Sequence, residues 1–82
     1  MSTCCPSFKW VFERDLGEAG GFDFALGGCA SCCRPWISVF VPASQATDYE
    51  PVGPKDLERM RALPEGRELA GFMRSWAREN LG

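Results

Sequence analysis

The chain has 82 residues, a net charge of −2 and an apolar fraction of 45%. This length suits one small domain, and such short chains often need a metal ion to supplement a limited core. The charge lacks the basic excess of nucleic-acid-binding proteins, and no apolar run reaches the length of a membrane span.

Alternating apolar residues predict two strands in the first third of the chain. The alternation involves Phe8, Trp10 and Phe12, and then Phe22, Phe24 and Leu26. Residues 14–21 contain three glycines and are typical of a turn. We expect a hairpin in which Glu13 lies opposite Phe22. That register places Cys4 opposite Ser31 and Cys5 opposite Ala30.

A third strand is predicted at residues 36–41, where the side chains of both faces are apolar except for Ser38. Such a run suits a central strand that is covered on both faces, or a strand that is covered by a helix and a partner. Pro35 and Pro42 bracket it, as proline tends to do at strand ends. Residues 42–53 are polar and rich in proline, and we expect a long loop there.

The last third, residues 54–81, predicts one kinked helix or two helices. Pro54 suits a first helical position, and Pro64 interrupts the pattern. The fold class is therefore α+β: a three-stranded antiparallel sheet with a cysteine cluster at one end and one or two C-terminal helices packed on it. We expect the helical residues Leu57, Met60, Leu69, Phe72, Met73 and Trp76 to meet Phe8, Trp10, Phe12, Phe22, Phe24, Ile37 and Val39.

All five cysteines lie in two short clusters, Cys4-Cys5 and Cys29-Ala-Ser-Cys32-Cys33. The predicted hairpin brings both clusters to one end of the sheet. Zinc in structural sites takes four ligands in a tetrahedron, and a Cys-x-x-Cys turn supplies two thiolates at suitable angles. Reduced, clustered cysteines without a signal peptide indicate a cytoplasmic protein.

The order of cluster, strand, turn, strand, cluster and strand resembles a zinc ribbon of the rubredoxin-like type over residues 4–41. The resemblance implies one zinc ion bound by Cys4, Cys5, Cys29 and Cys32, with Cys33 as an alternative ligand. The family often has glycine in a left-handed conformation after the second Cys-x-x-Cys pair. Cys33 stands at that position in this sequence.

No catalytic set of side chains is evident, since the chain contains no histidine. We therefore expect a non-catalytic adaptor or regulatory domain that contacts an unidentified protein or a second copy of itself. A thiol redox or soft-metal-handling role for Cys29-x-x-Cys32 is one alternative, and a nucleic-acid-binding ribbon is another. A further reading treats the cysteines as small buried apolar residues.

Overall fold

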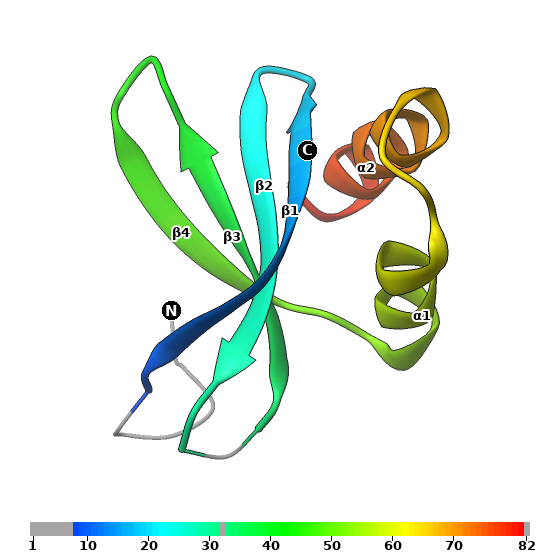
Figure 1. Ribbon diagram of the computed structural model, residues 1–82. Helices are drawn as coiled ribbons and strands as arrows, with labels where there is room; N and C mark the ends of the chain where they lie inside the picture. The colour runs from blue at the N-terminus through cyan, green and yellow to red at the C-terminus, as the bar shows by residue number, and fades with distance from the viewer. Residues whose placement is uncertain (1–7, 32, 82) are drawn as a thin grey trace.

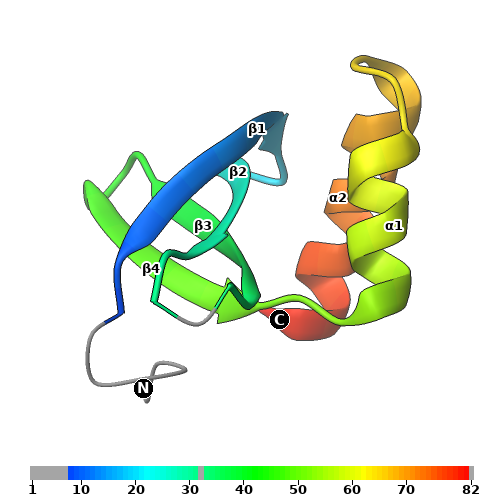
Figure 2. The same cartoon turned by 60° about the horizontal axis from the view of Figure 1, so that its bottom comes forward.

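A computed structural model of the chain describes residues 8–31 and 33–81. It contains one antiparallel sheet with strand order β1-β2-β3-β4, followed by two helices that form a second layer on one face of the sheet (Figures 1 and 2). The elements are β1 Trp10–Ala19, β2 Phe22–Cys29, β3 Pro35–Val41, β4 Ala46–Pro51, α1 Pro54–Ala62 and α2 Arg67–Asn80.

The α+β class is confirmed, but the prediction of three strands is wrong. A fourth strand, β4, lies inside the predicted loop 42–53 and pairs with β3 from Trp36 opposite Pro51 to Val41 opposite Ala46. Its side chains are mostly polar and solvent-exposed, so it lacks the apolar alternation that identifies a half-buried strand. With β4 in place, β3 has a neighbour on each side, as its apolar composition predicts.

The hairpin between β1 and β2 is longer than predicted, because β1 continues to Ala19 and only Gly20 and Gly21 form the turn. Both glycines have positive φ, 60° and 85°, which allows a tight two-residue connection. The strands are therefore paired from Ala19 opposite Phe22. The predicted pairing of Glu13 with Phe22 is wrong.

Two β-bulges interrupt β1, between Phe12 and Arg14 and between Asp15 and Gly17. A bulge inserts one extra residue into one strand, and this reverses the face on which the following side chains lie. Phe12 pairs with Gly27, whereas Arg14 pairs with Leu26, and these two partners lie on opposite faces of β2. The even-numbered residues of β1 thus change sides at Glu13.

The main core lies between the sheet and the helices. Its buried members are Leu16, Ala19, Phe24, Leu26, Ile37, Val39, Val52, Met60, Leu69, Met73, Trp76 and Ala77. Phe22, Leu57 and Phe72 are partly buried against it. The predicted contacts of the helical residues with β2 and β3 are confirmed. The predicted participation of Phe8, Trp10 and Phe12 is wrong, because the bulge at Glu13 leaves all three on the opposite face.

That opposite face carries an aromatic cluster of Phe8, Trp10, Trp36 and Tyr49. The ring of Phe8 lies 5.3 Å from those of Trp36 and Tyr49, and the ring of Trp10 lies 5.2 Å from that of Tyr49. Trp36 is 4% exposed although the helices lie on the other side of the sheet. Aromatic pairs at these spacings stabilise a small second core.

Helix α1 is fastened to β1 by the two residues at the first bulge. The guanidinium of Arg14 donates hydrogen bonds to the carbonyl oxygens of Met60 and Leu63, both at 2.6 Å. Glu13 accepts two bonds from Arg61, each 2.8 Å. Consecutive residues can both reach α1 because a bulge sets two residues against one on the partner strand. No helix in the described part of the chain is long and apolar enough to cross a membrane.

Candidate functional site: the cysteine-bearing end of the sheet

Cys29 ends β2, and Cys33 lies in the loop that joins β2 to β3. Cys29 is the last residue of β2, pairs with Trp10 and is 2% exposed. Paired residues share a face, so the thiol of Cys29 lies on the face of the aromatic cluster. Cys33 is exposed. The loop therefore combines one thiol inside the fold with one thiol at the surface.

The backbone of this loop forms a tight, hydrogen-bonded turn. The N–H of Cys33 donates to the carbonyl oxygen of Cys29 at 2.7 Å. The N–H of Cys29 donates to the carbonyl oxygen of Arg34 at 3.0 Å. Cys33 has φ of 61°, in the left-handed region that glycine usually occupies. The left-handed conformation thus falls on the residue that stands where zinc ribbons often have glycine.

Three of the four predicted zinc ligands, Cys4, Cys5 and Cys32, lie outside the described residues. The predicted register is wrong at Ala30, because the N–H of Ala30 donates to the carbonyl oxygen of Lys9 at 2.9 Å, four residues from the predicted partner. The shift follows from the longer β1 and its bulges. Within residues 8–31 and 33–81, no group of three or more histidine, cysteine or acidic residues could hold a metal ion.

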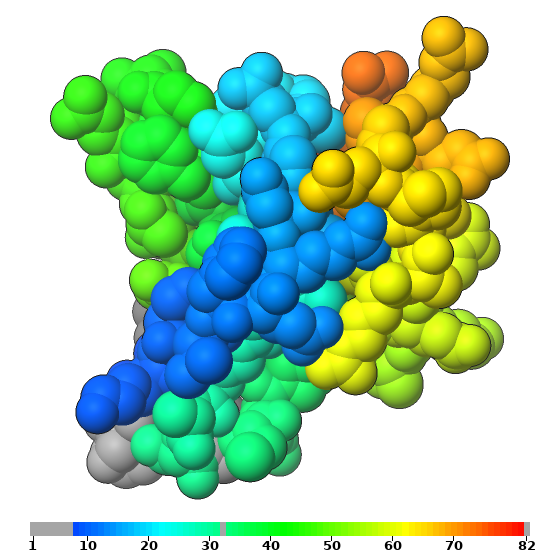
Figure 3. All heavy atoms as spheres, in the orientation of Figure 1, coloured from blue at the N-terminus to red at the C-terminus, as the bar shows by residue number. Residues whose placement is uncertain are grey.

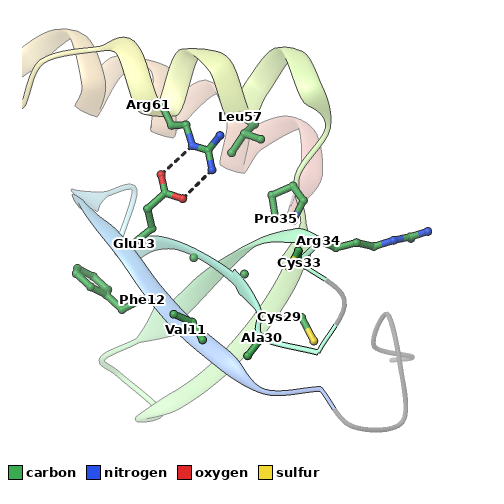
Figure 4. A pocket seen from close by; sticks show the side chains of 12 residues that line it. Val11, Phe12, Glu13, Cys29, Ala30, Cys33, Arg34, Pro35, Leu57 and Arg61 are labelled. Carbon is green, nitrogen blue, oxygen red and sulfur yellow. Dashed lines mark hydrogen bonds and ion pairs between the residues drawn. The ribbon is translucent and has the colours of Figure 1, made fainter.

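A groove of about 480 Å³ lies on the helix side of the same end of the sheet. Figure 4 shows Glu13 and Arg61 bonded to each other across it, with Leu57 on α1 and Pro35 on β3 nearby. The hydrogen bonds from Arg61 lower the pKa of Glu13, against a smaller opposing effect of burial. The same bonds raise the pKa of Arg61. Both groups therefore carry charge near neutral pH.

Sequence patterns gave no indication of this groove, because it depends on the packing of α1 beside β1, which brings Arg61 to Glu13. The signal that could have found it is the break in alternation at Glu13-Arg14, where two charged residues follow an apolar-alternating segment. Beside the groove, Val11 is 50% exposed and Phe12 is 58% exposed. They are the exposed large apolar residues of the described chain.

A scan against protein-family models finds no match for this chain, and neither do comparisons with curated proteins and with solved structures.

Proposed function

We propose that this chain is a non-catalytic zinc-binding domain that acts through contacts with proteins. Cys29 is the proposed ligand within the described residues, and Cys4, Cys5 and Cys32 complete the set. The observation that carries the proposal is the turn from Cys29 to Cys33, closed by a hydrogen bond and a left-handed residue. A tight turn of this kind suits two thiolate ligands of a tetrahedral zinc site.

The position of the N-terminal segment supports the same proposal. Lys9 is bonded to Ala30, and the ring of Phe8 packs on Trp36 over the face that carries Cys29. An extended chain advances about 3.5 Å per residue, so a stretch of three residues spans at most about 10 Å. That distance allows thiolates of both clusters to reach one ion.

The redox alternative receives less support from the local structure. Redox pairs of the thioredoxin type stand at the start of a helix in a βαβ unit. Here Cys29 ends one strand of an antiparallel sheet, and the loop leads into another strand. This setting favours a ligand over a catalytic thiol. The exposure of Val11 and Phe12 supports a role in protein contacts.

Native mass spectrometry tests the proposal on the chain purified with a reducing agent. We expect one zinc ion per chain, and structural zinc contributes on the order of 10 kcal/mol of apparent binding energy. Cys29→Ser should lose the ion and unfold or strongly destabilise the domain. The matched control is Cys33→Ser, in the same loop, which should retain the ion.

A second control exploits the left-handed backbone at Cys33. Cys33→Gly should retain zinc and raise the free energy of unfolding by about 0.5–1 kcal/mol, because glycine adopts this conformation without a Cβ clash. A folded wild-type chain without metal would overturn the zinc proposal. Full zinc content in Cys29→Ser would exclude Cys29 as a ligand.

A further inference from the structure

The outer edge of β1 at Trp10–Phe12 is open within the described residues. β1 is an end strand of the sheet, and no described strand pairs with its other side. Figure 3 shows β1, in blue, at the front surface of the molecule beside α1. The opposite edge strand, β4, carries Asp48, Glu50 and Pro51, which are residues that block edge pairing. On β1 the corresponding features, Lys9 and the bulge at Glu13, flank Val11 and Phe12 and leave these two apolar residues exposed between them.

The direction of the free backbone groups on β1 follows from its pairing with β2. Ala30 is bonded to Lys9, and residues bonded to the neighbouring strand recur at every second position of an antiparallel pair. Val11 is therefore the next residue bonded to β2, and its carbonyl oxygen lies against β2 at Gly27. The N–H and C=O groups of Trp10 and Phe12 point away from β2.

We propose that the edge of β1 pairs with the same edge of a second copy of this chain. The two strands run antiparallel about a twofold axis through Val11. Trp10 of each copy then exchanges both backbone hydrogen bonds with Phe12 of the other. Since paired residues share a face, the exposed ring of Phe12 extends the aromatic cluster of the second copy.

Charge complementarity selects a second copy and this register. With Val11 on the axis, Lys9 of one copy lies opposite Glu13 of the other, which gives two favourable pairs per dimer. An axis through Trp10 places Lys9 opposite Val11, and an axis through Phe12 places Val11 opposite Glu13. Either shift leaves a charged residue against an apolar one. The segment 9–13 is thus complementary to itself in one antiparallel register.

The paired segment is short, because the bulge at Glu13 ends the regular edge. Five residues from each copy bury less area than a stable interface of about 800 Å² per partner requires. The dimer is accordingly weak and forms at high micromolar concentration. Arg61 shares Glu13 with the incoming Lys9, and the carboxylate has the lone pairs to accept from both.

Sedimentation across a concentration series, with reducing agent and zinc present, tests the dimer. We expect the wild-type chain to shift from monomer to dimer as its concentration approaches about 1 mM. Val11→Lys sets two ammonium groups against each other on the axis and should raise the dissociation constant at least about a hundredfold. The matched control is Thr47→Lys, at an exposed position of β4, which should dimerise normally.

Two further measurements identify the surface. Lys9→Glu should raise the dissociation constant about tenfold, because each copy then meets Glu13 with a like charge. Amide hydrogen exchange at Trp10 and Phe12 should slow with rising concentration, while that of Val11 stays unchanged. A wild-type monomer throughout the series would overturn the proposal, as would a dimer that persists in Val11→Lys. Neither result bears on zinc content, so this inference and the zinc proposal fail independently.

Discussion

Replacing Arg14 by methionine tests how the two layers of the fold are joined. The guanidinium donates to Met60 and Leu63 at 2.6 Å and to Arg61 at 3.3 Å, all near the C-terminal end of α1. The carbonyl groups there have no partner within the helix, and the end of the helix carries partial negative charge. Arg14 from β1 therefore caps a helix that lies more than forty residues further along the chain.

The magnitude can be worked from these contacts. A hydrogen bond from a charged donor contributes about 1.5–3 kcal/mol, and Arg14 makes two short ones while remaining partly exposed. Taking the low end for each, Arg14→Met should reduce the free energy of unfolding by about 2–3 kcal/mol. For a domain of this size, that lowers the melting temperature by about 10–20 °C. A nine-residue helix is not stable alone, so α1 should fray first.

Urea and thermal unfolding followed by circular dichroism measure the loss. The matched control is Arg74→Met on the exposed side of α2, where no ion pair is seen within the described residues. Arg14→Lys should fall between wild type and Arg14→Met, because one ammonium cannot span both carbonyl groups. Equal stabilities for Arg14→Met and Arg74→Met would refute the reasoning, since the cap would then contribute nothing.

Two further predictions concern the aromatic face and the ion pair. Gly27→Ala should destabilise the fold by about 2 kcal/mol in urea unfolding, because its Cβ meets the Val11 carbonyl oxygen and lies 2.6 Å from Cη2 of Trp10. Gly71→Ala, in an open stretch of α2, should instead stabilise it by about 0.5–1 kcal/mol. Glu13 has a pKa below its ordinary value of 4.5, so its contribution is present above pH 4.5 and disappears as pH falls through the lowered pKa. Glu13→Gln should remove this loss of stability at acid pH, which amounts to less than about 1 kcal/mol because the ion pair is exposed. If the free energy of unfolding of the variant falls with pH as in the wild type, the ion pair does not contribute.

The helices and the central strands follow from sequence because their signals are local. Leu69, Met73 and Trp76 repeat at helical spacing and are buried together. Pro54 is the first residue of α1, and the helical structure is interrupted around Pro64 before α2 begins. The apolar residues of β3 indicate a strand with neighbours on both sides. In these segments, local preference and burial point to the same structure.

The N-terminal strand could not be predicted in the same way. Its apolar residues alternate as in a half-buried strand, but the local sequence does not determine which face of the sheet they occupy. Trp10 and Phe12 alternate as core residues do, yet they lie on the face without helices. Their side is decided by the bulge at Glu13, which depends on pairing with β2 and on contacts with α1. β4 was not predicted for another reason. It is held in the sheet by backbone pairing with β3, and its exposed side chains show no alternation of apolar and polar residues.

At the cysteine-bearing end of the sheet, the local sequence motif predicts the turn but not the pairing of the strands around it. The spacing of Cys29 and Cys32 indicated a tight turn between strands, and the left-handed φ of Cys33 is a local property of that turn. The approach of Lys9 to Ala30 is not local, since its register depends on bulges in β1. The register is displaced by four residues at Ala30, which is bonded to Lys9 where the prediction had Cys5. The meeting of the two cysteine clusters at one end of the sheet therefore stays a prediction, because Cys4 and Cys5 lie outside the described residues.

The bulge at Glu13 links three features that would otherwise seem unrelated. It separates Trp10 and Phe12, on the aromatic face, from the core residues that follow, and it brings Arg14 to the same side as Glu13, so that both contact α1. It also ends the regular edge of β1, so that residues 9–13 form the described part of this edge that can pair with another strand. A longer regular edge with exposed apolar residues would favour open-ended association into fibres. A short, self-complementary edge that stops at a bulge instead closes on one partner, and this limits the proposed assembly to a dimer.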